Sequence, residues 1–302
     1  MEKLSKNIPG YLEKRAILDF LDMGLKSNFG TSELRKSFSL NPMNHSSLVQ
    51  LTTVERFSKR VEYYQKYRPS YPNTLIEFLL KSQLLKTNSK IADIGSGTGL
   101  LSELFLKRGY EVQGIEPNSK MRKAAESFLC KFPNFQSING RAEKTTLNTE
   151  SADLIVAAQS FHWFNLKLAR LEFNRILKKE CSVVILWNEL EKDRTTFLKK
   201  YEDLLLKYGI DYSRVRHQNI SETQIKHFFK PTSVQKRVLV NSQVFDLKGL
   251  IGRTLSSSFT PLFGHPSHQP MMDELTQLFS EQQEGGKVTF LYQTLVYTGR
   301  FS

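Results

Sequence analysis

The nine residues 91–99, which read IADIGSGTG, constrain this chain of 302 residues more than any other segment. A short apolar run reaches Asp93, and glycine then occupies alternate positions before an amphipathic stretch begins at Leu100. Because glycine has no Cβ and accepts positive φ, this backbone can turn sharply and let a ligand lie against it. The free N–H groups and partial positive charge of the following helix point at the same place. The segment therefore predicts a strand, a turn and a helix that hold a nucleotide-like ligand.

Two familiar nucleotide-binding turns do not fit this spacing. A dinucleotide fingerprint reads G-x-G-x-x-G, but Leu100 stands where its third glycine belongs, and Gly99 comes one residue early. A P-loop needs Gly-Lys-Ser/Thr after the turn, and no such residues follow here. The pattern that is left is D-x-G-x-G-x-G.

A second acidic residue strengthens the ligand prediction. Glu116 ends the run 111–116, which reads EVQGIE, about 17 residues after Gly99 and near the spacing at which a βαβ unit delivers a carboxylate to ribose hydroxyls. An ionised carboxylate offers two acceptor oxygens for such hydroxyls. Turn and acid together predict a ligand that contains a nucleoside.

Strands and helices alternate from Lys90 onward, which indicates βαβ units and a parallel sheet covered on both faces. The first five expected strands are 90–94, 111–116, 135–140, 152–158 and 182–188, with helices at about 99–108, 118–131 and 166–178. Two long strands, 234–245 and 288–301, can pair antiparallel at one edge of the sheet. We therefore expect a Rossmann-like, doubly wound α/β fold. Its sheet would have seven strands, mostly parallel with an antiparallel last strand, plus a helical insertion that acts as a lid.

The expected domain organisation is an N-terminal extension, residues 1–50, followed by one domain, residues 51–302. Apolar residues at helical spacing between Leu12 and Leu21 predict that the extension is partly helical. Further helices are expected at about 54–67, from an Asn73 cap to Leu80, and on the apolar face of 197–208. The insertion spans about 246–286, with helices near 247–256 and 270–283 and a loop at 256–266.

Composition excludes several classes of protein. No apolar run reaches about 18 residues, so no membrane span is expected, and the N-terminus lacks the apolar stretch of a signal peptide. Cys130 and Cys181 have no metal-ligand spacing and are expected to be buried, reduced thiols. The net charge is +13, but the lysines and arginines are spread singly or in pairs along the chain, so no nucleic-acid partner is expected. These features predict a cytoplasmic protein without a metal. We expect a monomer or homodimer.

From about Arg56 to the C-terminus, the chain resembles the class I S-adenosylmethionine (SAM) dependent methyltransferases of the methyltransferase type 11 group. Residues 93–99, DIGSGTG, resemble the glycine motif that the whole superfamily shares. Three further segments resemble the trans-aconitate-methyltransferase-like branch: YQKYRPSYP at 64–72, QSFHWF at 159–164 and SSSFTP at 256–261. Residues 1–50 match no family that we recognise.

The resemblance implies a set of cofactor-binding residues. Tyr64 and Arg68 would close over the carboxylate of SAM, since arginine offers a planar fork for carboxylates, and Asp93 would lie near the methionine end. Gly95, Ser96 and Gly97 would let the backbone approach the ligand, whereas Gly99 would serve helix packing. The remaining expected contacts are Glu116 and Pro117 at the ribose, Met121, Ala142 and Glu143 at the adenine, and Gln159 beside the methyl donor. Asp93 as a cap, Met121 as core filler, Glu143 as a solvated acid and Arg68 in a surface pair are the plainer alternatives.

Catalysis and acceptor binding are assigned to two other segments. His162 and Trp163 follow the fourth strand at the edge where ligands bind in open α/β sheets, so both are expected to line the active site. Arg253, Ser257 and Ser258, with Tyr292 nearby, could hold an anionic acceptor; a solvated helix end and a plain serine-rich loop are the alternative.

The predicted function is transfer of the SAM methyl group to a small-molecule acceptor, with carboxylate O-methylation favoured. A carboxylate is ionised at neutral pH and needs no base, whereas a phenol or amine must lose a proton, for which His162 is the candidate. The alternatives are C- or N-methylation of a biosynthetic intermediate, an RNA- or protein-modifying methyltransferase, and a SAM-binding protein without turnover.

Overall fold

The computed structural model describes residues 60–210, 212 and 220–301, all within the compact unit His45–Ser302. The prediction for residues 1–50 lies outside the described residues, as does the first part of the helix expected at 54–67. The described part of that helix is α3, Val61–Tyr67.

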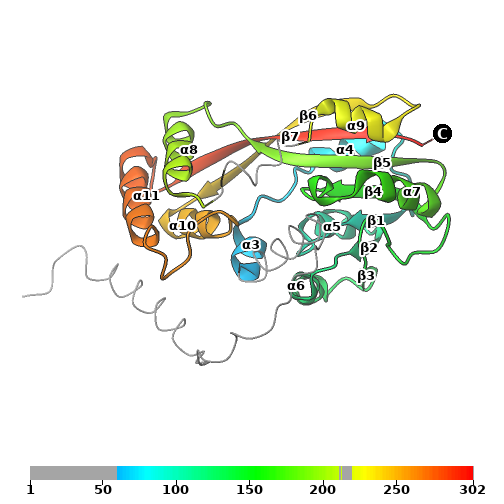
Figure 1. The fold of residues 1–302 in the computed structure, drawn as a ribbon, viewed down its shortest axis with the longest axis horizontal. Coiled ribbons are helices and arrows are strands. Elements are labelled where there is room, and N and C mark those ends of the chain that lie inside the picture. The colour runs from blue at the N-terminus through cyan, green and yellow to red at the C-terminus, as the bar shows by residue number, and fades with distance from the viewer. Residues whose placement is uncertain (1–59, 211, 213–219, 302) are drawn as a thin grey trace, which may run out of the picture. The chain divides into compact units, whose positions relative to one another are not determined.

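A seven-stranded sheet forms the centre of the fold, as predicted (Figure 1). Its strands are β1 (Lys90–Ile94), β2 (Glu111–Ile115), β3 (Phe135–Ile138), β4 (Ala152–Ala158), β5 (Leu177–Leu190), β6 (Gln235–Phe245) and β7 (Val288–Gly299). They lie in the order β3-β2-β1-β4-β5-β7-β6. Neighbours from β3 to β5 pair in parallel, and β7 pairs antiparallel with both β5 and β6. The strand order reverses between β1 and β4, which is where open α/β sheets bind ligands.

Helices cover both faces of the sheet because successive strand side chains point to opposite sides. On one face, α4 (Thr74–Lys81) and α5 (Leu100–Leu106) pack against Ile91, Val156 and Leu186. On the other, α7 (Leu166–Ile176) and α9 (Glu222–Phe229) pack against Ile155, Ile185 and Trp187. Helix α6 (Ser119–Leu129) connects β2 to β3. The doubly wound α/β prediction is confirmed.

A separate helical cap stands at one end of β6 and β7, where α8 (Thr196–Tyr208), α10 (Leu247–Leu255) and α11 (His268–Gln282) gather (Figure 1). Its core combines Leu204, Leu250 and Leu275 with Phe290 and Tyr292 of β7. The buried residues of β7 thus pack against the cap helices at one end of the strand. At the other end they belong to the cores on the two faces of the sheet. Two of the three cap helices come from the predicted insertion, and α8 follows β5.

Most differences from the prediction are local. Helix α9, whose Ser221 and Gln224 form a capping box, was not predicted, and Asn73 precedes α4 without a side-chain cap. Strand β5 begins at Leu177 rather than at residue 182. Its residues 178–180 are polar and interrupt the apolar pattern, and the pairing of β5 with β4 shifts register across them.

Both cysteines are free, but Cys130 is exposed and Cys181 half-buried, so the expectation of buried thiols was wrong. Cys130 directly follows α6, past the last buried residue Leu129.

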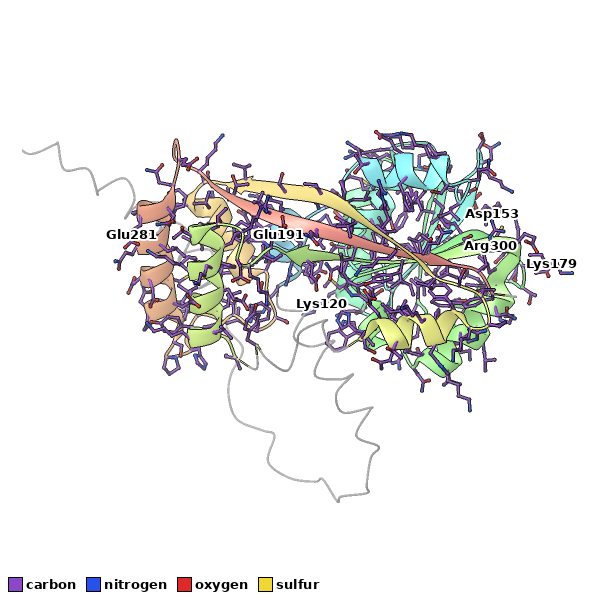
Figure 2. All side chains as sticks on the ribbon, turned by 90° about the horizontal axis from the view of Figure 1, so that it is seen from above. Lys120, Asp153, Lys179, Glu191, Glu281 and Arg300 are labelled. Carbon is purple, nitrogen blue, oxygen red and sulfur yellow. The ribbon has the colours of Figure 1, made fainter. Side chains whose placement is uncertain are left out.

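Charged side chains lie at both ends of the described part of the chain, with Glu281 at one end and Lys179 and Arg300 at the other (Figure 2). Several basic residues pair with carboxylates, among them Lys200 with Glu281 and Lys178 with Asp153. Within the described ranges, no helix is long and apolar enough to cross a membrane, and no cluster of three metal-ligating side chains occurs.

Candidate active site

The predicted turn joins β1 to α5 with the conformation that its glycines allow. Gly95 and Gly97 have φ of +71° and +58°, values that favour glycine. A Cβ on Gly95 would lie 2.5 Å from the Ser160 Cβ, so the turn is closely packed on that side. A Cβ on Gly97 would meet no atom within 4 Å, so that side is open. The turn therefore leaves room for a ligand beside Gly97. As predicted, Gly99 serves packing, against Leu129 of α6.

Asp93 is buried at the end of β1, with 1% of its surface exposed. Ser102 of α5 donates to its Oδ2 over 2.7 Å, while no described residue donates to the buried Oδ1. Burial, and to a lesser extent the nearby Glu116, raises the pKa of Asp93 to about 7. A buried carboxylate oxygen without a donor is costly, so this atom fits the ammonium group of a ligand such as SAM.

The raised pKa makes a prediction about stability. An acid whose pKa is raised in the folded state stabilises the fold most at low pH, and this contribution is lost as pH rises to about 7. We expect the melting temperature of the ligand-free protein to fall between about pH 4 and 7, and Asp93→Asn to flatten that fall. Glu116, whose pKa burial also raises, keeps part of the slope. Melting curves across this range check the prediction, and an unchanged slope in the variant would contradict it.

Glu116 lies just past β2 and braces the turn. Its Oε2 accepts the Gly97 N–H over 3.1 Å, and its Oε1 accepts the Asn118 N–H over 2.8 Å. Asn118 in turn caps α6 through the N–H groups of Lys120 and Met121. Each carboxylate oxygen has further acceptor capacity, so Glu116 can brace the turn and still accept from ribose hydroxyls.

A cleft of about 200 Å³ opens beside the turn. Most of the predicted site residues line it, and they come from α3, the turn, the segment after β4 and the cap. They are Tyr64, Arg68, Asp93, Gly95, Ser96, Gly97, Gln159, His162, Trp163, Arg253, Ser257 and Ser258. The structure therefore brings together residues that are almost 200 positions apart in the sequence.

Five predicted residues, all assigned to the nucleoside half of the cofactor, do not line this cleft. Glu116 and Pro117 follow β2, and Met121 and Ala142 are buried. Glu143 accepts the N–H of Asn165, the cap of α7, over 2.7 Å. Their assignment to ribose and adenine stays a prediction.

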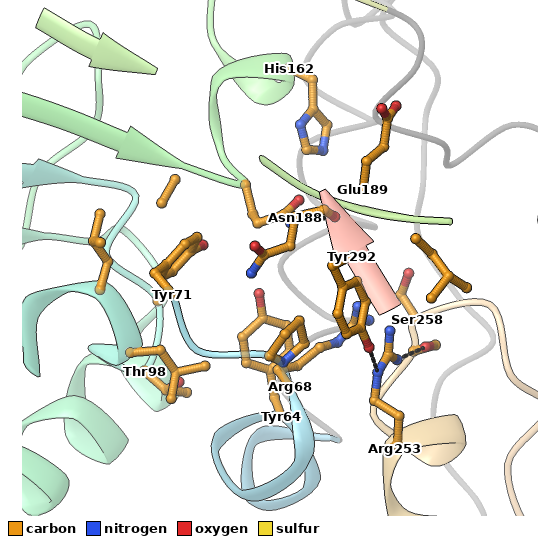
Figure 3. Close-up of a pocket in the computed structure, with 18 of the residues that line it drawn as sticks. Tyr64, Arg68, Tyr71, Thr98, His162, Asn188, Glu189, Arg253, Ser258 and Tyr292 are labelled. Atoms are coloured by element: carbon orange, nitrogen blue, oxygen red, sulfur yellow. Dashed lines mark hydrogen bonds between the residues drawn. The ribbon is translucent and has the colours of Figure 1, made fainter. Parts of the chain in front are cut away.

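Two arginines, the buried Arg253 and the half-buried Arg68, lie near each other in the cleft (Figure 3). Arg253 donates to the Tyr292 hydroxyl over 3.2 Å and to Ser257 Oγ over 3.1 Å. Arg68 donates to the Ser256 carbonyl over 3.1 Å, and no described residue accepts from its buried Nε. Burial, followed by the charge of Arg253, lowers the pKa of Arg68 to about 10. Both guanidinium groups are therefore still charged at neutral pH.

No carboxylate among the described residues forms an ion pair with either arginine. Burial of a charge without a counterion is costly. Two such charges beside a cleft therefore indicate that the cleft binds anionic groups.

His162 and Trp163 lie in a short 3-10 helix after β4, Phe161–Trp163, with their rings 4.5 Å apart. Gln159 precedes it and donates to the Asn188 carbonyl over 3.1 Å. His162, after β4, and Glu189, near the end of β5, both line the cleft and are labelled in Figure 3.

The sequence reasoning missed several residues of the cleft: Tyr71, Asn188, Glu189, Lys192, Tyr201 and Tyr212. Asn188 and Glu189 end β5 at the same sheet edge as His162, so the polar residues at the end of the fifth predicted strand could have indicated them. Tyr201 and Tyr212 come from α8 and the chain after it, and no motif marks them.

Comparison with known proteins agrees with this geometry. A family model described as "Methyltransferase domain" matches residues 92–185. An uncharacterized methyltransferase-like protein of Schizosaccharomyces pombe is 24% identical over 251 residues, which cover 81% of this chain and 95% of the relative. An uncharacterized methyltransferase of Mycobacterium tuberculosis is 30% identical over 132 residues, about half (51%) of its length.

The fold is also that of a solved structure, a putative type II methyltransferase from Anaeromyxobacter dehalogenans. The two chains are 18% identical with a TM-score of 0.56, over 78% of this chain and 98% of the other. The turn, the cleft and the matched methyltransferase domain agree: this chain is a SAM-dependent methyltransferase with a Rossmann-like fold.

Proposed function

We propose that this enzyme transfers the methyl group of SAM to the carboxylate of a small molecule, as its resemblance to the trans-aconitate-methyltransferase-like branch also suggests. The observation that carries the proposal is a pair of arginines in the cleft, the buried Arg253 and the half-buried Arg68, without a carboxylate partner among the described residues. Two cations suit two carboxylates, one on the cofactor and one on the acceptor.

The cofactor half of the cleft suits the charged methionine end of SAM. Asp93 offers a buried oxygen for the ammonium group, and Arg68 with Tyr64 offers donors for the carboxylate. The open side of Gly97 allows close approach of the ligand to the backbone. The bound cofactor supplies a methyl group on a positively charged sulfur, which makes that methyl electrophilic.

The acceptor half is built around Arg253. Its guanidinium is fixed by Tyr292 and Ser257, so it is oriented before the acceptor binds. Tyr201 and Phe259 line the same region and would exclude water around the acceptor. A carboxylate held there is already ionised at neutral pH, so His162 and Trp163 would shape the site rather than remove a proton.

Matched pairs of acceptors test this function. Labelled methyl transfer from SAM is measured for carboxylic acids, their primary amides, phenols, amines and RNA. We expect the acids to accept label and the amides, which lack the charge, to fail. Transfer to phenols or amines alone would contradict the carboxylate assignment and return His162 to the role of base. Transfer to RNA alone would contradict a small-molecule acceptor.

A further inference from the structure

Helix α3 carries Tyr64 of the cofactor half and is followed directly by Arg68, yet none of the helix's own side chains is fully buried. Its attachment to the cap instead runs through polar contacts at both ends. Arg68, just after the helix, donates to the Ser256 carbonyl. Along the helix, Tyr67 packs on α10 so closely that a Cβ on Gly252 would lie 2.2 Å from its ring.

The strongest attachment is at the start of the helix. Arg60 is buried, with 6% of its surface exposed, and its guanidinium donates to three backbone carbonyls of one loop. These are the carbonyls of Leu255 at 2.9 Å, Ser257 at 2.5 Å and Thr260 at 2.5 Å. Arg60 does not line the cleft, whereas Ser257, Ser258 and Phe259 of that loop do.

This loop, residues 255–260, is the part of the acceptor half that fixes Arg253, because Ser257 Oγ accepts from its guanidinium. The loop also has internal bonds, from Ser256 Oγ to the Arg253 carbonyl and from Thr260 Oγ1 to the Thr254 carbonyl. Those bonds shape the loop locally. Arg60 and Arg68, at the two ends of α3, join this helix to the loop.

We propose that Arg60 is a positioning residue that couples the two halves of the site. Cofactor bound at Tyr64 and Arg68 restricts the motion of α3. Because Arg60 hydrogen-bonds the loop that orients Arg253, the loop then becomes less mobile as well. Bound SAM thereby stabilises the acceptor half in the arrangement that the loop contacts already define. This inference rests on the proposed function, since it assumes that the cofactor contacts α3.

Hydrogen exchange of the full chain, with and without saturating S-adenosylhomocysteine, tests the coupling without an acceptor. In the wild type, we expect the ligand to slow exchange in peptides covering residues 253–262 about fivefold. In Arg60→Met, the loop should lose that protection, while the turn 95–99 stays protected. Arg60→Lys, which restores one donor group, should recover part of it.

A matched control is Arg170, which also binds backbone carbonyls, those of Phe228 and Lys230, on the far side of the sheet from α4 and α5. Arg170→Met should leave the ligand effect on the loop intact. Equal loop protection in wild type and Arg60→Met would overturn the coupling. No protection of the turn in the wild type would instead overturn cofactor binding itself. If Arg60→Met does not fold, Arg60→Lys decides the question, since full protection of its loop would overturn the proposal.

Discussion

Replacing Gly95 with alanine should weaken S-adenosylhomocysteine binding about 100-fold, or about 2.7 kcal/mol. The added Cβ would lie 2.5 Å from the Ser160 Cβ and 2.9 Å from its hydroxyl oxygen. That hydroxyl donates to the Ile94 carbonyl at the start of the turn, so moving Ser160 also weakens a hydrogen bond that holds the turn. Calorimetric titration of the purified variant measures the loss.

The control separates binding from backbone strain. Gly109 also has positive φ, +84°, and a Cβ there would meet no atom within 4 Å. Gly109→Ala should therefore lose stability through conformational strain, about 1–2 kcal/mol, but bind S-adenosylhomocysteine as the wild type does. Wild-type affinity in folded Gly95→Ala would contradict our account of the turn.

Replacing Arg253 with methionine should lower kcat/KM for the best carboxylic acid about 30-fold or more, because truncating a buried charged partner costs about 2–5 kcal/mol. The acceptor carboxylate would lose the guanidinium that Tyr292 and Ser257 orient. Affinity for S-adenosylhomocysteine should change little, since Arg68 and Asp93 are intact. Steady-state kinetics and calorimetry on the same preparation check both statements.

The same variant should not be less stable than the wild type. Arg253 is 7% exposed and has no described carboxylate partner, so its charge costs free energy in the ligand-free protein. A methionine of similar length removes that cost. Replacing a functional residue often raises stability while it lowers activity. A large fall in melting temperature would indicate that Arg253 is structural, and unchanged kinetics would contradict its role at the acceptor.

The cofactor turn was predictable because its chemistry is local. Asp93, Gly95 and Gly97 lie within five consecutive residues, and the strand before them and the helix after them follow from hydrophobic periodicity. Parallel pairing then brings the end of β2, with Glu116, beside the turn. The antiparallel pairing of β6 with β7 was also predictable, because the residues of β7 alternate in the period-two pattern of a strand.

The cap side of the cleft was less predictable because it depends on packing between distant segments. Arg253 and Ser257 were found through a resemblance, but Tyr201 and Tyr212 enter the cleft only because α8 packs on α11 and the cap core. Arg60 shows the limit most clearly: its three acceptors are 195 to 200 residues away and are all backbone carbonyls. No pattern of side chains in the sequence could indicate them.

The position of the transferred methyl group tests the central claim most directly. The enzyme is incubated with methyl-labelled SAM and the carboxylic acid that accepts label best, and the purified product is treated with mild base. A methyl ester releases its label as volatile methanol, and this release is the result that we predict. Label that stays in the product after base treatment would place the methyl on nitrogen, carbon or a phenol oxygen, and would contradict carboxylate methylation at Arg253.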